Sequence, residues 1–178
     1  MAESAHIVSL LICVATEFEA SILRDRIGEF PRVRLVVTGV GPVNAAHAAT
    51  VAIIEDRPDE IVVCGVGGAY PSSGLRVGDV ASAEVEVYGD LGSQSPSGFL
   101  DMKALGFPVV TAPSVHFNEL PMQVFPTTGL ARFVTVSTCT GTEATASELV
   151  SRTRGAVENM EGAAVAHVSR LHGIPVGE

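Results

Sequence analysis

Apolar runs and helix-like segments alternate along the first third of the chain. Residues 6–14, 33–38 and 61–63 are apolar runs with many β-branched side chains, and each is predicted to be a strand. Residues 20–27 space their apolar side chains as a helix does and residues 44–54 are rich in alanine, so both are predicted helices. Strands that are apolar on both faces are typical of a sheet covered by helices on each side. The pattern predicts an α/β fold, with three layers (α/β/α) and a central mixed, mostly parallel sheet.

The pattern changes in the middle of the chain. Residues 80–88 alternate roughly with period two, which predicts a partly exposed strand, with antiparallel pairing as one option. Residues 89–123 are rich in Gly, Pro and Ser, and we interpret them as an excursion or lid within the same domain. Their aromatic residues Phe99, Phe107 and Phe117 could stack on a planar ligand, although filling the core is the commoner use of such side chains.

The last third returns to alternating strands and helices. A strand is predicted at residues 131–137, followed by a helix at 143–154 with Thr142 as its N-cap. A helix of small residues is predicted at 160–172, and residues 174–178 look like the start of another strand. The length of 178 residues and the 47% hydrophobic content suit one domain with a sizeable core.

Charge and cysteine usage narrow the class of protein. The net charge of −9 argues against a nucleic-acid or anionic-membrane surface. Cys13, Cys64 and Cys139 lie in apolar runs without ligand-like spacing, so we expect buried, reduced thiols and no metal site. The N-terminus lacks a basic region, and no apolar stretch reaches the roughly 18–20 residues that span a bilayer. These features predict a soluble cytoplasmic protein without a membrane partner.

Glycines follow the predicted strand at residues 61–63, in the sequence Gly65-Val66-Gly67-Gly68. Glycine has no Cβ, so a ligand can approach the backbone amides closely at this end of a strand, where open α/β sheets bind ligands. A tight turn that needs positive φ angles is an equally good explanation. The chain contains neither G-x-G-x-x-G nor G-K-[ST], so no dinucleotide or phosphate loop is predicted.

Two glutamates are candidates for chemistry. Thr16 and Glu19 have the spacing of a capping box, which by itself explains Glu19. The alternative is a carboxylate just beyond a strand end that could hold a water molecule. Glu161 lies in the predicted first turn of the helix at 160–172, where the helix dipole favours an anion. The small residues that follow let this helix press against the sheet, which would turn Glu161 toward the same crevice as the glycines.

Five separated segments stand in the order found in the nucleoside phosphorylase/nucleosidase superfamily. They are ATEFE (15–19), TGVGPVNAA (38–46), GVGGA (65–69), LRVGDV (75–80) and NMEGAA (159–164). Within that superfamily the chain most resembles the futalosine hydrolases. The segments that carry this closer resemblance are GGAYP (67–71), SGFLD (97–101), LGFP (105–108) and VSTCTGT (136–142).

The resemblance implies hydrolysis of the N-glycosidic bond of futalosine, which gives hypoxanthine and dehypoxanthine futalosine in an alternative menaquinone pathway. It implies that Glu19 orients and deprotonates the water, and that Glu161 accepts hydrogen bonds from the ribose hydroxyls while Met160 packs on the sugar. Gly67, Gly68 and Asn159 would complete the substrate-binding set. The partners implied are a small nucleoside and water, with no cofactor, no metal and no nucleic acid. The family also implies a homo-oligomer, a dimer or larger.

Two departures from the family pattern matter. Phosphorylases of the superfamily place an arginine just before the glycine loop to bind phosphate, and here Val63 stands there, which favours water as the nucleophile. Family members place the acid that protonates the leaving purine after a strand that lies beyond Glu178. We therefore expect the C-terminal strand and helix of the nucleosidase domain to lie outside residues 1–178, and no residue here is assigned as that acid.

Alternatives stay open. A methylthioadenosine/S-adenosylhomocysteine or aminofutalosine nucleosidase would show the same framework, although methylthioadenosine nucleosidases carry a serine where this chain has Val66. A non-catalytic nucleoside-binding module would bind the ligand without releasing its base.

Overall fold

The computed structural model describes residues 9–28, 30–125 and 129–178, and the α/β architecture is confirmed. The helices are α1 (Glu17–Ile27), α2 (Pro42–Asp56), α3 (Met102–Leu105), α4 (Glu143–Thr153) and α5 (Gly162–His172). The strands are β1 (Leu10–Val14), β2 (Val33–Val37), β3 (Glu60–Val63), β4 (Gly68–Ala69), β5 (Ala81–Tyr88), β6 (Gly92–Ser95), β7 (Gly98–Asp101), β8 (Glu119–Pro121), β9 (Gly129–Thr135), β10 (Val157–Asn159) and β11 (Val176–Gly177). The part of the predicted first strand at residues 6–8 lies outside the described residues.

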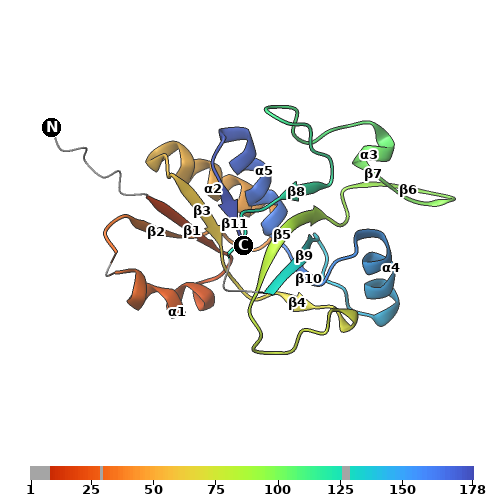
Figure 1. Ribbon diagram of the computed structural model, residues 1–178, viewed down its shortest axis with the longest axis horizontal. Helices are drawn as coiled ribbons and strands as arrows, with labels where there is room; N and C mark the ends of the chain where they lie inside the picture. The colour runs from red at the N-terminus through yellow and green to blue at the C-terminus, as the bar shows by residue number, and fades with distance from the viewer. Residues whose placement is uncertain (1–8, 29, 126–128) are drawn as a thin grey trace.

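Two sheets lie side by side in the molecule (Figure 1). The first has the order β11-β3-β1-β2 with every pair parallel, as its apolar runs predict. The second has the order β4-β10-β9-β5-β8 and is mixed, because β4 and β8 are antiparallel to their neighbours. The β6–β7 hairpin stands apart from both sheets.

Helices cover the sheets and close the core. α1 packs on β1 and β2 on one side of the first sheet, and α2 and α5 pack on each other on the other side (Figure 1). The alanines of α2 and α5 allow this close approach, since Ala45, Ala49, Ala163 and Ala166 are fully buried. α5 also contacts β5 and β9, so it connects the two sheets.

Strand β5 differs from its prediction. Glu84 is the one exposed side chain within it, and β5 lies between β9, to which it is parallel, and β8, to which it is antiparallel. Glu86, which period-two alternation placed on the same outward face, is fully buried. A bulge between Ala83 and Val85 shifts the register and breaks that alternation.

The cysteine expectation is partly wrong. Cys13 is buried in β1, and burial raises the pKa of its thiol to about 12. Cys64 and Cys139 are exposed, because each follows the end of a strand on the side where loops gather. Apolar neighbours in sequence do not bury a residue once its strand has ended.

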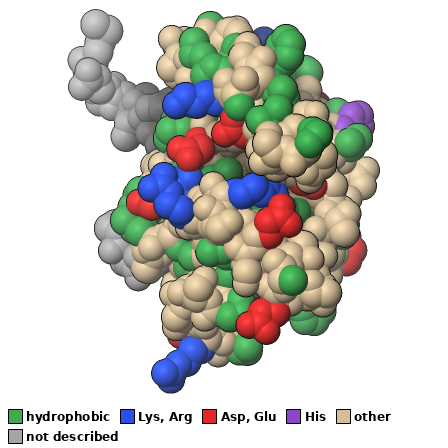
Figure 2. Space-filling view, turned by 90° about the vertical axis from the view of Figure 1, so that its right-hand side faces the viewer, with side chains coloured by type: hydrophobic (Ala, Val, Ile, Leu, Met, Phe, Trp, Pro, Cys, Tyr) green, Lys and Arg blue, Asp and Glu red, His purple; other side chains and the backbone are tan. Residues whose placement is uncertain are grey.

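Residues 89–123 form the β6–β7 hairpin, α3 and β8 at the outer edge of the second sheet (Figure 1). The Arg152 guanidinium lies over the ring of Phe99, with its central carbon 4.2 Å from the ring centroid. Phe107 is largely exposed. Figure 2 shows this side of the molecule, where acidic and basic side chains are interspersed. The ion pairs of Arg132 with Glu119 and of Arg152 with Glu148 involve β8, β9 and α4.

Candidate functional site

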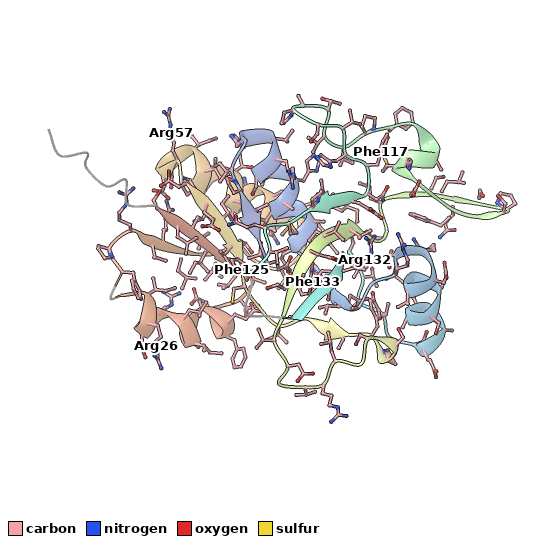
Figure 3. All side chains as sticks on the ribbon, in the orientation of Figure 1. Arg26, Arg57, Phe117, Phe125, Arg132 and Phe133 are labelled. Carbon is pink, nitrogen blue, oxygen red and sulfur yellow. The ribbon has the colours of Figure 1, made fainter. Side chains whose placement is uncertain are left out.

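An open cleft of about 720 Å³ lies where the carboxyl ends of β1, β2 and β3 in the first sheet meet those of β9 and β10 in the second. The segments that follow β1, β3, β9 and β10 supply most of its wall, and Val40 after β2 completes it. A second cavity of about 410 Å³ adjoins it and shares Glu19, Asn159 and Glu161 with it. Phe125 and Phe133 line this inner cavity near the junction of the sheets (Figure 3). Ligand binding is expected at this end of parallel strands.

Glu19 is held at the start of α1. The predicted capping box is present: Thr16 Oγ1 accepts from the Glu19 amide at 3.3 Å, while Glu19 Oε2 accepts from the Thr16 amide at 2.9 Å. The other oxygen, Oε1, accepts from the Val66 amide at 3.0 Å. The capping hydrogen bonds therefore also orient Glu19 for the site, because they turn its carboxylate toward the glycine loop.

The glycines after β3 make room for this carboxylate. A Cβ on Gly65 would lie 2.6 Å from Glu19 Oε1, so only glycine allows the contact with the Val66 amide. Gly67 lines the inner cavity and Gly68 lines the open cleft, where it pairs with Glu158 of β10. Gly65, Gly67 and Gly68 do not have positive φ angles, so close approach rather than backbone strain explains the glycine loop.

Glu161 is the N-cap residue of α5 rather than part of its first turn, and its side chain does not cap the helix. Its Oε1 accepts from the Gly41 amide at 2.8 Å and its Oε2 from the Met160 amide at 3.2 Å. Gly41 is 120 residues away in sequence, so the tight Gly41-Pro42 start of α2 reaches across to hold this carboxylate. Each oxygen keeps acceptor capacity for a ligand hydroxyl.

The predicted set is brought together. Glu19, Gly68, Asn159, Met160 and Glu161 all line the open cleft. Gly67 faces the inner cavity. Asn159 lines both spaces, and its Oδ1 accepts from the Glu161 and Gly162 amides at 3.1 and 3.0 Å.

Sequence reasoning missed the far wall of the cleft. Glu158 is buried in β10, where its Oε2 accepts from the Tyr70 hydroxyl at 2.7 Å and its Oε1 from the Thr140 amide at 2.9 Å. Burial and this carboxylate both raise the pKa of Tyr70. The loop at residues 138–142 is thereby anchored beside Met160, whose sulfur lies 3.4 Å from Cys139 Sγ. No sequence signal marked Glu158, because β10 (Val157–Asn159) is too short to show a periodic pattern.

Two further findings concern the described part of the chain. No three His, Cys, Asp or Glu side chains gather there in the way that a metal ion requires. None of its helices is both long and apolar enough to cross a membrane.

The fold and the cleft define an α/β protein with a ligand site at the carboxyl ends of parallel strands. The chain belongs to the phosphorylase superfamily, whose family model matches residues 13–178.

Two curated relatives are both futalosine hydrolases. The protein from Streptomyces coelicolor is 39% identical over 154 residues, which is 81% of this chain and 63% of the relative. The protein from Thermus thermophilus is 32% identical over 146 residues, 77% of this chain and 62% of the relative. This chain therefore spans less than two thirds of the length of these relatives.

Solved structures share the fold. A futalosine hydrolase mutant of Helicobacter pylori superposes with a TM-score of 0.77 at 16% identity, covering 96% of this chain and 87% of that one. The S-adenosylhomocysteine nucleosidase of Streptococcus pyogenes also gives a TM-score of 0.77, at 19% identity, covering 98% and 82%.

Proposed function

We propose that this chain forms the catalytic body of a futalosine hydrolase, which releases hypoxanthine from futalosine with water in menaquinone biosynthesis. The observation that carries the proposal is the meeting of Glu19 and Glu161 in one cleft, each oriented by backbone amides. The identity to futalosine hydrolases over about four fifths of the chain supports this substrate over other nucleosides.

The two carboxylates have different parts in the proposed reaction. Departure of the purine leaves an oxocarbenium-like sugar, so the site needs a water molecule activated on one face and stabilisation of the ribose. Glu19 would take the proton from the water, and Glu161 would accept hydrogen bonds from the ribose hydroxyls. Those charge-assisted bonds strengthen as the sugar becomes cationic, so they favour the transition state over the ground state.

Water rather than phosphate is the proposed nucleophile. Val63 occupies the place of the phosphate-binding arginine of phosphorylases and is buried in β3, with 7% of its surface exposed. Burial among apolar side chains would leave a phosphate dianion at this point without cationic partners.

The decisive experiment measures free purine released from futalosine, aminofutalosine and methylthioadenosine, with phosphate present and absent. Hypoxanthine release from futalosine that does not depend on phosphate is the expected result. A preference for methylthioadenosine would transfer the proposal to the nucleosidase relatives, one of which, from Shewanella baltica, is 26% identical over 97% of this chain. Binding without release of any base would refute the enzymatic proposal.

A substitution at Glu19 tests the assigned base. Glu19→Gln is expected to lower the rate of base release by about 10²- to 10⁴-fold, the range of general base catalysis, because the amide cannot take a proton from water. Glu17→Gln is the matched control, since Glu17 is exposed on the same helix and pairs with Arg24. Equal rates for Glu19→Gln and the control would remove Glu19 from the mechanism.

We also propose a cytoplasmic homo-oligomer. Val40 and Val66 are 50% and 77% exposed beside the cleft, and Phe18 of α1 is 72% exposed. A second copy that covers these side chains would remove apolar surface from water next to the site.

A further inference from the structure

A pair of carboxyl groups lies at the wall of the inner cavity, which Glu178 lines. Glu86 on β5 is fully buried, and Glu178, which follows β11, points its side chain to the same place. Asn159 Nδ2 donates to Glu86 Oε1 at 2.6 Å and to Glu178 Oε1 at 3.2 Å. In the described part of the chain, no Lys, Arg or His forms an ion pair with either carboxyl. Two uncompensated charges here would be costly.

The orientation of Asn159 is determined by its backbone contacts. Two backbone N–H groups, those of Glu161 and Gly162, point at its side chain, so the atom that faces them must be the oxygen. The NH₂ group therefore faces the carboxyl pair. The same amide thus connects the start of α5 to Glu86 and Glu178.

Counting protons around Thr135 requires one on Glu86. Thr135 Oγ1 accepts from the Ala163 amide and lies 2.7 Å from both Glu86 Oε2 and Asn159 Oδ1. The hydroxyl has one proton, so it cannot donate to two acceptors. If Glu86 Oε2 carries a proton and donates it to Thr135, then Thr135 donates to Asn159 and every contact is satisfied.

A second proton is required between the two carboxyls. Glu178 Oε2 is buried, and no described donor faces it. This atom and Glu86 Oε1 both lie against the backbone of Gly162, where a Cβ would be 2.1 Å from the first and 2.5 Å from the second. Because ionised carboxylates only accept, two carboxyl oxygens this close to the same point are satisfied only when one of them carries a proton, and Glu178 Oε2 is the one without a donor.

We propose that Glu86 and Glu178 are a protonated acid pair that positions Glu161: their protons lock the Asn159 amide, and its oxygen holds the first amides of α5. Ionisation of the pair would turn the Thr135 hydroxyl proton toward Glu86. The Thr135 and Asn159 oxygens would then face each other without a proton between them, and Glu161 at the start of α5 would be held less firmly. The catalytic consequence rests on the proposed function, whereas the protonation of the pair does not.

The electrostatics of the surroundings agree. Burial raises the pKa of Glu86, and burial together with the neighbouring Glu86 raises the pKa of Glu178 well above its usual range. The other titratable groups that face the pair are Glu161 and Cys64 toward Glu178, and Tyr88 toward Glu86. None of these is a cation that would stabilise an ionised carboxylate, and the negative charge of Glu161 favours the protonated form of Glu178.

Infrared spectroscopy and pH-dependent melting test the pair without any substrate. The wild-type chain at pH 7 is expected to show the C=O stretch of protonated carboxyl groups, and the double variant Glu86→Gln/Glu178→Gln is expected to lose it. Glu84→Gln is the matched control, because Glu84 is exposed on the same strand. Absence of the band in the wild type, or its persistence in the double variant, would overturn the proposal.

The melting experiment has a definite sign. The pKa values of Glu86 and Glu178 are raised in the folded state above the unfolded value of about 4.3, so the folded protein binds more protons. Stability is therefore fully present below that unfolded pKa and is lost as the pH rises through the folded pKa. The melting temperature of the control should fall with rising pH, and that of the double variant should fall less. Equal slopes would contradict the proposal.

Kinetics test the positioning role. Glu86→Ala removes the proton donor to Thr135 and is expected to lower kcat for base release about tenfold or more by misplacing Glu161. Glu86→Gln supplies an N–H in place of the O–H and is expected to restore most of that loss. A glutamine variant as slow as the alanine variant would contradict the neutral-donor role. If the wild type releases no base, the proposed function fails. The infrared band and the melting slopes still test whether Glu86 and Glu178 are protonated.

Discussion

At the scale of single residues, the site depends on backbone amides that orient carboxylates. Glu19 is held by Thr16 and Val66, and Glu161 by Gly41 and Met160. The Thr16 contacts are local and follow from a four-residue pattern. The Val66 and Gly41 contacts join segments far apart in sequence. The first needs the space left by Gly65, and the second is made by the amide of Gly41, which has a positive φ.

Gly65→Ala separates stability from activity at this scale. The added Cβ would press on the end of the flexible Glu19 side chain, which can move away, so we expect little change in the free energy of unfolding. The displaced carboxylate should lower base release by about 10²-fold. Gly129→Ala is the control, since no atom of the described residues lies within 4 Å of the Cβ that the substitution would add. Wild-type kinetics for Gly65→Ala would contradict the assigned position of Glu19.

At the scale of elements, β10 organises the deep wall of the cleft. It lies between β4 and β9 and ends at Asn159, and α5 begins three residues later. Its Glu158 joins Tyr70 after β4 to the loop that follows β9. A three-residue strand thus fixes two loops and one helix start.

Tyr70→Phe tests this anchoring. The substitution removes the hydroxyl that donates to buried Glu158 and leaves an acceptor unpaired, so we expect a loss of about 1.5–3 kcal/mol in the free energy of unfolding. Chemical denaturation measures this loss. Faster proteolysis of the loop at residues 138–142 should accompany it. An unchanged denaturation midpoint would show that the hydrogen bond does not stabilise the wall.

At the scale of the whole molecule, large apolar side chains remain exposed on α1 and α2. Phe18 and Ile22 lie one turn apart on α1, so they share a face, and they are 72% and 66% exposed. Val43 at the start of α2 is 83% exposed. Association of copies through this surface would bury it.

The double variant Phe18→Ser/Ile22→Ser is expected to shift the chain toward monomer in analytical ultracentrifugation, because it removes apolar area from the proposed contact. Leu171→Ser is the control, since Leu171 is 61% exposed at the far end of α5. A wild-type chain that sediments as a monomer at every concentration would refute the oligomer.

The sequence by itself determined the features that depend on neighbours along the chain. The alternation of strands and helices, the capping box at Thr16 and the N-cap at Thr142 are all confirmed. Local hydrogen bonds and periodicity set these features, so a short window of sequence contains the information.

Only the tertiary structure decided which side chains meet and which are buried. Parallel pairing of β1 with β3 brings their carboxyl ends together, and this is why Glu19 contacts the glycine loop. The burial of Glu86 depends on strands on both sides of β5 and on α5 above it, none of which its own period-two pattern encodes. The exposure of Cys64 and Cys139 likewise follows from where the strands end in space, because burial is a property of the packed surroundings and not of sequence neighbours.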